Sequence, residues 1–490
     1  MVVVIMNSSG SPVVAPLSQV PSEAAKRLLP WLVAVAFFME SLDTTILNTA
    51  VPAISEALHV TPLSMKAVLA SYTLSLAVFI PISGWVADRF GTRRVFAAAI
   101  GLFTLGSFLC GISSSIDALV ACRVLQGIGG SMMVPVGRMT LVRTFAKSGL
   151  LRAMSFVSIP ALVAPMLGPI AGGLIVGYLH WRWIFFVNIP IGLIGLVLVY
   201  LHLPDYREEV THALDVVGLI LFGSGIALLS YVLEVFGEHT LGVREIAGLL
   251  AVSLSLLGGY WVHAKSLRFP LLQLSLFRIR TFRAAVGGGF FTRLGIGGVP
   301  FLLPLLYQVG LGFTPIQSGL LIMPQALAAI SINAVIPRLL AFFGYRGVLV
   351  SNTIIIGLLL LVFAMIGLTT PVWAIVVLGF LYGGFTALQY TSMNTLVYAD
   401  TTEEETSAAN SIFSTVQQMA ISFGVATAGL ATAFFLPKYS QSNSTLMIAG
   451  LHKALFSLGI LTILSTIVFR SLKREDGQVV SQHKVISPGG

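Results

Sequence analysis

The chain is a succession of long apolar runs separated by short polar segments. Its apolar runs are each about 20 residues or longer, which is the length that an α-helix needs to cross the hydrocarbon core of a bilayer. Gly and Pro occur inside these runs, and both are tolerated in membrane helices. The pattern predicts an all-α integral membrane protein with fourteen transmembrane helices, at about 31–51, 66–87, 93–112, 118–142, 151–178, 182–201, 213–235, 243–264, 282–308, 316–343, 346–369, 371–398, 406–435 and 449–470.

Basic residues are distributed unevenly among the polar segments. An even number of helices places both termini on one side of the membrane, and most of the 28 Lys and Arg residues then fall on segments of that side. Cytoplasmic loops are expected to hold such an excess. Both termini are therefore predicted to be cytoplasmic. The net charge of +9 reflects this topology, so we expect no nucleic-acid partner.

The sequence repeats itself at a shift of 253 residues. At this shift Phe37-Phe38 meets Phe290-Phe291, Thr61-Pro62 meets Thr314-Pro315, and the loop FGTRRV at 90–95 meets FGYRGV at 343–348. Parallel repeats are a known plan of transporters, with the substrate site at their interface. We expect a flexible cytoplasmic tail at 1–30, an N-terminal six-helix bundle at 31–201, a linker with helices 7 and 8 at 202–281, a C-terminal six-helix bundle at 282–470 and a cytoplasmic tail at 471–490.

Composition excludes several classes of protein. Only 10% of the residues are charged, against about 25% in soluble proteins, so most of the surface must face lipid. Two cysteines, Cys110 and Cys122, make neither a disulfide framework nor a Cys-rich metal site. No Gly-x-x-x-x-Gly-Lys-Ser/Thr loop is present, which argues against ATP coupling. No His/Glu cluster has zinc spacing, and we expect no metal and no cofactor.

Two acids lie deep in the first predicted helix. Glu40 and Asp43 are three residues apart and share a helix face. They lie roughly 14 and 18 Å into the membrane. Intramembrane carboxylates are functional candidates, and a buried acid beside a like charge can bind and release a proton near neutral pH. A static hydrogen-bonded contact is the alternative for each of them.

The loop after helix 2 combines small, acidic and basic residues. Its candidate residues are Gly84, Asp88, Arg89, Gly91, Arg93 and Arg94. A basic cytoplasmic turn is the simpler interpretation, but the loop resembles the signature loop of the major facilitator superfamily. In that superfamily the acid after helix 2 meets the start of the helix equivalent to helix 13 and closes the cytoplasmic side. The resemblance implies such a latch for Asp88, with arginines within reach of Glu403–Glu405.

Helices 4 and 5 carry further motifs of that superfamily. RVLQGIGG at 123–130 is similar to its second motif, whose arginine is linked to proton transfer; the alternative for Arg123 is a side chain that reaches to the outer membrane surface. Helix 5 resembles the antiporter motif that marks exporters, with ordinary tight packing as the alternative. The residues of this motif are Pro165, Gly168, Pro169, Gly172 and Gly173.

Two stretches, at 42–52 and 181–192, are similar to motifs of the fourteen-helix drug:proton antiporter family (EmrB/QacA type). The resemblance covers nearly residues 30–470. It implies the major facilitator fold, two six-helix bundles plus two inserted linker helices. It also implies a monomeric, proton-coupled exporter of drug-like, cationic or amphipathic compounds in the bacterial inner membrane, working by alternating access, and not an enzyme. Export of one native metabolite is the alternative, and a membrane receptor or an intramembrane enzyme is a more distant one.

Polar residues at membrane depth are candidates for lining the substrate cavity, although any one of them can be a helix–helix hydrogen bond. These candidates are Asp43, Glu40, Asn48, Gln126, Arg293, Gln325, Gln389 and Asn394. The repeat places Glu40 on Arg293, so we expect these two to face each other across the cavity, as a direct ion pair or through water. Asp43 would then be the acid that titrates, with Glu40 and Arg123 as further proton-coupling residues. The alternative is that Glu40 and Arg293 each satisfy their charge locally.

Overall fold

Helices make up nearly all of the chain that the structure describes. The computed structural model describes residues 2–6, 12–16, 23–145, 147–208, 213–238, 242–402, 405–435 and 444–478. Within these residues, thirteen helical spans are long and apolar enough to cross a membrane, and a shorter apolar helix, Val163–Tyr178, adds to them. Backbone polar groups in hydrocarbon must be bonded within their own segment, which is why the apolar runs form helices. The all-α membrane fold expected from the apolar runs is confirmed.

The N-terminal half consists of six spans, the last of which is broken into two helices. Each predicted run from residue 31 to residue 201 lies within one of them. The spans are α1 (Glu23–Ala57), α2 (Met65–Phe90), α3 (Thr92–Ile112), α4 (Ile116–Thr144), α5 (Lys147–Tyr178), and α6 (Trp183–Phe186) with α7 (Asn188–His202).

The C-terminal half also consists of six spans, and here the first is broken. Gly297 and Gly298 separate its first two helices, and Pro300 near the start of the second lacks a donor for a continuous helix. The spans are α10 (Arg280–Ile296) with α11 (Val299–Leu305) and η4 (Leu306–Gly310), α12 (Pro315–Ile332), α13 (Ile336–Phe363), α14 (Val372–Leu396), α15 (Thr406–Phe435) and α16 (Ser444–Phe469).

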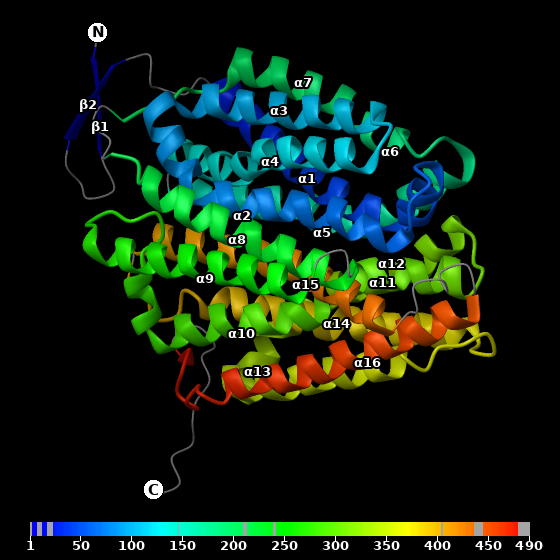
Figure 1. Ribbon diagram of the computed structural model, residues 1–490. Helices are drawn as coiled ribbons and strands as arrows, with labels where there is room; N and C mark the ends of the chain where they lie inside the picture. The colour runs from blue at the N-terminus through cyan, green and yellow to red at the C-terminus, as the bar shows by residue number, and fades with distance from the viewer. Residues whose placement is uncertain are drawn as a thin grey trace, which may run out of the picture.

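The two halves lie against each other, and the start of α1 and the end of α16 lie on one side of the molecule. Figure 1 shows α1–α7 as one group and α10–α16 as the other. We call the side that holds the start of α1 and the end of α16 the terminal side, and the opposite side the far side. A hairpin of β1 (Val2–Met6) and β2 (Pro12–Pro16) lies outside the bundle. The expected flexible tail at 1–30 therefore contains this hairpin and the first eight residues of α1.

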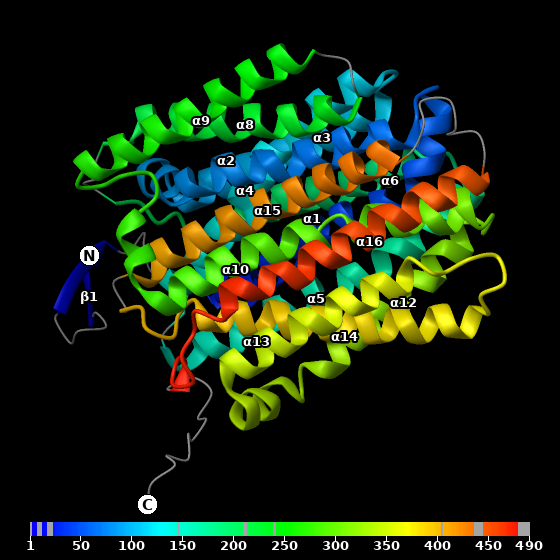
Figure 2. The same cartoon turned by 60° about the horizontal axis from the view of Figure 1, so that its bottom comes forward.

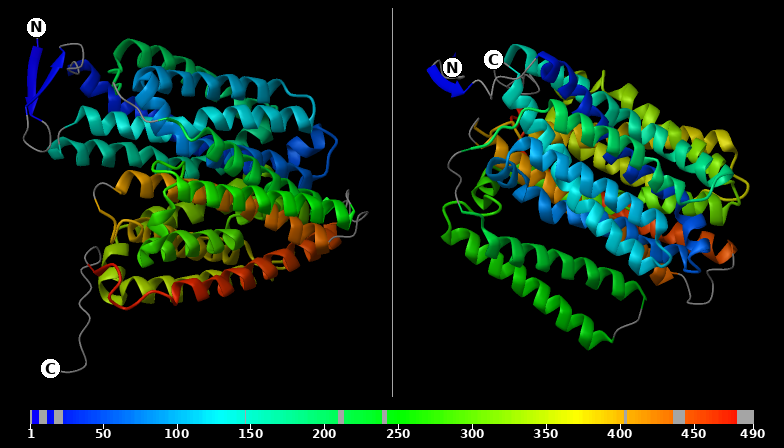
Figure 3. Two further views of the ribbon diagram at one scale, coloured as in Figure 1. Left: turned by 60° about the vertical axis from the view of Figure 1, so that its left-hand side comes forward. Right: turned by 90° about the horizontal axis from the view of Figure 1, so that it is seen from above.

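Two inserted helices, α8 (Val216–Glu238) and α9 (Val243–Ser266), pack on each other and against α2 and α15. Figures 2 and 3 show the pair at one edge of both halves. Asp215, before α8, fixes the pair: its Oδ1 lies 2.8 Å from Nε2 of His263 on α9, and its Oδ2 accepts from the backbone N–H of Leu271 at 3.1 Å. Burial raises the pKa of Asp215, but these bonds and one from Gly218 outweigh burial and hold it below its usual value.

The sequence repeat is also a repeat of local conformation. Gly91 joins α2 to α3 with φ 96° and ψ 140°, and Gly344, its counterpart, breaks α13 with φ 66° and ψ 166°. Such positive φ values favour glycine. Thr61 and Thr314 are likewise both N-caps whose side chains accept a backbone N–H, from Ser64 and Gln317 respectively. The shift of 253 residues thus superimposes the same turns in the two halves.

Among the described residues, the apolar cores join the two halves mainly on the far side. One core combines residues of both halves, such as Ile54 and Leu63 with Leu302 and Met447. The core of α1–α4 and α7 near the terminal side contains only residues of the N-terminal half. A third core belongs to the C-terminal half together with α8 and α9, and Ala77 of α2 contacts it. The structure is therefore closed on the far side.

Candidate functional site

The deepest charges of the N-terminal half form one hydrogen-bonded cluster around Asp43 of α1. Arg123 Nη1 of α4 donates to Asp43 Oδ2 at 2.5 Å. Asp43 Oδ1 accepts from Gln126 Nε2 at 2.9 Å and from Asn188 Nδ2 at 3.0 Å. Both amides also donate to Ser107 Oγ of α3, at 2.7 Å and 3.3 Å. The side chains thus join α1, α3, α4 and α7 at one point, which we call the Asp43 cluster.

Arg123 points into the bundle. Its guanidinium lies over the ring of Tyr72 on α2, 4.3 Å from the centroid, an arrangement that attracts a cation. Its Nη1 also donates to Gln126 Oε1 at 2.7 Å. The side chain is only 1% exposed. The alternative, that this arginine reaches outward to the membrane surface, therefore does not apply.

Burial makes the two charges of the Asp43 cluster depend on each other. Asp43 and Arg123 are both 1% exposed, and Gln126 and Asn188 are fully enclosed. Removing one partner of a buried ion pair leaves an uncompensated charge and costs about 3–5 kcal/mol. A proton added to Asp43 would do the same, because it would neutralise the acid and leave Arg123 without its counter-ion. The arrangement can therefore link proton binding to movement of the helices that carry it.

Glu40 lies one turn before Asp43 and outside the cluster. Its Oε2 is enclosed and has no hydrogen-bond partner among the described residues, whereas Oε1 is neither bonded nor enclosed. The charged groups that act on Glu40 are Arg138 of α4 and Asp43. The guanidinium of Arg138 lies over Phe37, 5.4 Å from the ring centroid. Glu40 thus has its nearest opposite charge within its own half.

The expected ion pair between Glu40 and Arg293 is not present in the structure, where no hydrogen bond or salt bridge joins these two described residues. Arg293 of α10 instead lies over Tyr390 of α14 and Phe413 of α15, 4.5 and 5.8 Å from the ring centroids. Its Nη1 donates to the Gly289 carbonyl at 3.4 Å. Pseudo-symmetry gave the two residues equivalent positions on α1 and α10, but the described contacts of Arg293 are with its own half and Glu40 has no bonded partner among the described residues.

A polar seam without charge joins the third and fourth spans of the C-terminal half. Gln389 of α14 donates to Thr353 Oγ1 of α13 at 2.9 Å and accepts from Asn352 Nδ2 at 2.8 Å. All three side chains are buried. Gln389, expected to line the cavity, is therefore a helix–helix contact in this conformation.

The other expected cavity residues do not join either set. Asn48 Nδ2 bonds the Thr44 carbonyl of its own helix at 3.3 Å. Gln325 of α12 has an enclosed Nε2 without a partner among the described residues, and its backbone lies directly against Gly383 of α14. Asn394 is exposed on α14.

The loop after α2 is held to its own half. Asp88 Oδ1 accepts from Arg143 Nη2 of α4 at 2.7 Å, and Arg143 also donates to Glu208 at 2.9 Å. Asp205 accepts from the backbone N–H of Arg93 at 3.0 Å, and its Oδ2 lies 3.9 Å from Nε of Arg94.

The expected latch with the start of α15 is not among these contacts. Gly84 has open space where a Cβ would lie, and Arg89 is exposed. Glu405 caps α15 by accepting from Thr402 N–H at 3.1 Å, while Glu403 and Glu404 lie outside the described residues. The halves are closed on the far side, so the loop after α2 has no partner to close on in this conformation.

The glycines of α5 let it pack closely on two helices. A Cβ on Gly168 would lie 2.1 Å from Thr45 Oγ1 of α1. A Cβ on Gly172 would lie 2.5 Å from the Ile46 carbonyl of the same helix. A Cβ on Gly173 would lie 2.6 Å from the Pro315 carbonyl of α12, in the other half. Pro165 and Pro169 lie inside the same helix, and the Pro169 carbonyl would lie 2.3 Å from a Cβ on Gly319 of α12.

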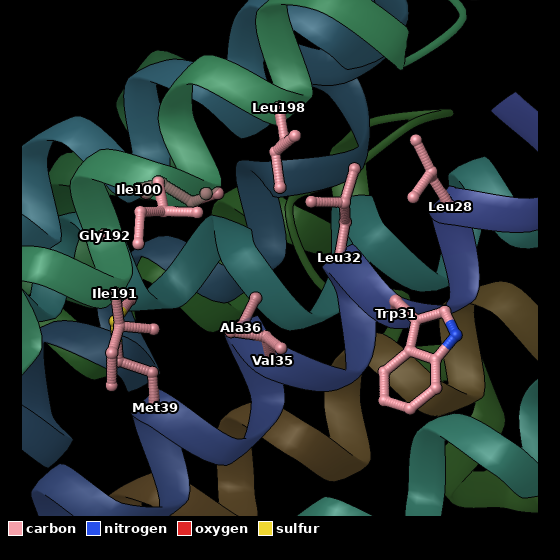
Figure 4. Close-up of a pocket in the computed structure, with 12 residues that line it drawn as sticks. Leu28, Trp31, Leu32, Val35, Ala36, Met39, Ile100, Ile191, Gly192 and Leu198 are labelled. Atoms are coloured by element: carbon pink, nitrogen blue, oxygen red, sulfur yellow. The ribbon is translucent and has the colours of Figure 1, made fainter. Parts of the chain in front are cut away.

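One surface pocket contains none of the expected site residues. It lies between α1, α3 and α7, and its lining is apolar (Figure 4). Trp31 and Leu32 line it from α1, Ile100 from α3, and Ile191 and Leu198 from α7. Without polar groups it can orient no charged ligand, and we do not assign the transport site to it.

Sequence analysis missed several partners in these contacts. Asn188 lies inside the stretch at 181–192 that suggested the family, but was not expected to reach Asp43. Arg138 lies within the predicted helix 118–142, but was not assigned to the site. Ser107 and Tyr390 carried no signal, because hydroxyl and aromatic residues are frequent along apolar helices. Arg143 looked like one more basic residue at a helix end.

Comparison with known proteins gives this geometry a context. The sequence matches the profile of the Major Facilitator Superfamily over residues 33–425. It is 40% identical to MdtD of Klebsiella pneumoniae (strain 342), a protein named for multidrug resistance, over 93% of this chain and 96% of the relative. It is also 40% identical to MdtD of Pectobacterium atrosepticum, over 86% of this chain and 90% of the relative.

Solved structures show the same fold at low sequence identity. A bacterial homologue of the human lysosomal transporter Spinster, inward-facing and occupied, superimposes with a TM-score of 0.66 at 12% identity, covering 92% of this chain and 97% of that one. A D-xylose–proton symporter superimposes with a TM-score of 0.63 at 12% identity, covering 92% and 99%.

Proposed function

The chain belongs to the Major Facilitator Superfamily and is a membrane transporter, not an enzyme, and from this premise we propose that it exports drug-like compounds in exchange for protons. The observation that carries the proposal is the enclosed ion pair of Asp43 and Arg123. An acid at that depth, bonded only by protein groups, changes its surroundings when it takes up a proton. The multidrug-resistance names of relatives about 40% identical support drug-like compounds as substrates.

Glu40 is the proposed entry point for the proton. It lies one helical turn from Asp43, and its Oε1 is neither bonded nor enclosed, whereas both oxygens of Asp43 are bonded. A proton taken up at Glu40 would pass to Asp43 and release Arg123 from its counter-ion. A cationic substrate would favour the opposite change, because it is attracted by ionised Glu40. Proton and cation then compete for the same acids, which is the requirement for exchange.

The described contacts support alternating access, in which the substrate site opens to one side of the membrane at a time. On the far side, Gln308 donates to the Thr49 carbonyl at 2.9 Å and Ser422 to the Ala70 carbonyl at 3.1 Å, each across the two halves. From the positive charge on the loops we infer that the terminal side lies in the cytoplasm, with the protein in the inner membrane of a bacterium. The structure then corresponds to an inward-facing state. Export would need these far-side contacts to open.

The test is ethidium efflux by the full-length protein in proteoliposomes, driven by an imposed proton gradient. Asp43→Asn keeps the size of the side chain but removes its charge, so we expect efflux to fall to the rate of protein-free vesicles while ethidium still binds. Purified wild-type protein should release protons when ethidium is added, and the variant should not. Asp117→Asn, which changes an exposed acid at the start of α4, is the matched control and should transport normally. If Asp43→Asn exports at the normal rate and releases protons, Asp43 is not the coupling group.

A further inference from the structure

Arg293 is a buried cation without a counter-ion. It is 2% exposed, and no carboxylate forms a salt bridge with it among the residues that the structure describes. Leaving a charge without a counter-ion at membrane depth is costly. Arg123, the buried arginine of the other half, has an acid at 2.5 Å. The rings of Tyr390 and Phe413 attract the guanidinium of Arg293, but no described acid neutralises its charge.

The three nitrogen atoms of the Arg293 guanidinium differ in their hydrogen bonding. Nη1 makes a long bond of 3.4 Å to the Gly289 carbonyl, and Nε is enclosed without a partner. Nη2 has no hydrogen bond and keeps some accessible surface. A guanidinium presents its donors as a planar fork that matches carboxylate geometry. Two of the donor nitrogens on this fork are thus unoccupied, and one of them keeps accessible surface.

The surroundings of Arg293 suit the rest of an aromatic ligand. Tyr390 and Phe413 place ring faces against the guanidinium from α14 and α15. Gly289, one turn before Arg293, lets Nη1 lie against the backbone of α10, since a Cβ there would lie 2.9 Å from that atom. Arg293 lies on the first helix of its half, at the position that the repeat equates with Glu40. The first helices of the two halves meet where parallel repeats hold their substrate.

We infer that Arg293 binds the anionic group of a transported compound, a carboxylate or a sulfonate on an aromatic or amphipathic body. The inference rests on the proposed transport function and widens its substrate class from cations to organic anions. Glu40 then attracts positive groups of transported compounds, and Arg293 attracts negative ones. Compounds that carry both groups would meet both.

Equilibrium binding to the detergent-solubilised full-length protein tests this with a matched pair of probes. 1-Naphthylacetate and 1-naphthylacetamide share a ring and a shape and differ in charge. A charged hydrogen bond contributes about 1.5–3 kcal/mol, so the acetate should bind about tenfold or more tightly than the amide. Arg293→Gln should reduce the ratio of the two dissociation constants to about one. Arg293→Lys, which keeps the charge, should preserve part of the preference.

Arg338→Gln is the matched control, because it removes a positive charge from an exposed position of the same half, and it should leave the ratio unchanged. Equal affinity of the wild-type protein for the two probes, absence of acetate binding, or a ratio that survives in Arg293→Gln would overturn the inference. Should Arg293→Gln fail to fold, the wild-type ratio and Arg293→Lys still decide. Binding needs no proton gradient, so failure of the proposed proton coupling would leave these outcomes untouched.

Discussion

In the N-terminal half, Gln126 of α4 donates to Ser107 of α3; in the C-terminal half, Gln389 of α14 donates to Thr353 of α13. The two glutamines are both fully enclosed and both join the third and fourth spans of their half. Around Gln126 the chain adds the ion pair of Asp43 and Arg123. Around Gln389 it adds only the amide of Asn352.

The difference shows how a duplicated frame can divide its tasks. Both halves need a polar bond between neighbouring helices, since such bonds fix which helix faces meet. Only the N-terminal half converts that bond into a charged cluster that a proton can disrupt. The C-terminal half keeps a neutral seam and places its one deep charge, Arg293, away from any described acid. Arg123 thus has a counter-ion, whereas Arg293 has none among the described residues.

The largest effect should follow from removing Arg123. Arg123→Gln leaves Asp43 ionised in an enclosed site, and we expect the free energy of unfolding to fall by about 3–5 kcal/mol. The double variant Asp43→Asn/Arg123→Gln contains no unpaired charge and should recover most of this loss without recovering transport. Thermal unfolding of the purified proteins in detergent measures both. Equal destabilisation of the single and double variants would show that the ion pair does not hold the cluster together.

The two glutamines should differ in a smaller but measurable way. Gln126→Leu removes bonds to charged groups, at about 1.5–3 kcal/mol each, whereas Gln389→Leu removes neutral ones, at about 1 kcal/mol. We therefore expect Gln126→Leu to unfold at the lower temperature and to slow ethidium efflux. Gln389→Leu should transport at nearly the wild-type rate. If efflux falls equally in both, the neutral seam takes part in coupling and the comparison of the halves is wrong.

The repeated glycines offer a third contrast. Gly91→Ala and Gly344→Ala both place a Cβ at positive φ with extended ψ, a region almost restricted to glycine, which costs roughly 1–3 kcal/mol. At Gly91 the Cβ would also lie 2.4 Å from Asp205 Oδ1, the atom that caps the start of α3. Losing a cap costs about 1 kcal/mol, so Gly91→Ala should be the less stable variant by about that amount. Equal melting temperatures would mean that Asp205 moves away without cost.

The sequence predicted the helices better than it predicted their breaks and contacts. Apolar runs of sufficient length specify membrane helices regardless of detail. The Gly295–Pro300 stretch suggested freed carbonyls, but not where the helix would break, because glycine and proline are tolerated in unbroken membrane helices too. Asp43, Arg123 and Gln126 were found because polar residues stand out in apolar runs. Arg293 was found for the same reason and paired wrongly. A repeat fixes depth along a helix, while the side chain's partner depends on the neighbouring helices.

The smallest effect concerns the loop after α2, on the side where the two halves behave alike. In this conformation each half pairs its terminal side with itself: Arg143 holds Asp88 in the first half, and Arg280 binds Asp476 in the second. Asp88 and Arg143 are each about a quarter exposed, so their bond contributes about 1 kcal/mol or less. A contact that weak can be exchanged when the far side opens.

Cysteines at positions 88 and 407, in a chain with Cys110 and Cys122 replaced by Ala, should then crosslink only in the outward-facing population. We expect little crosslinking in the resting protein and more under an imposed proton gradient, measured by the mobility shift on non-reducing gels. A pair at positions 117 and 407, on opposite sides of the bundle, is the control that should never crosslink. If positions 88 and 407 fail to crosslink in every condition while transport continues, the loop after α2 does not latch onto α15.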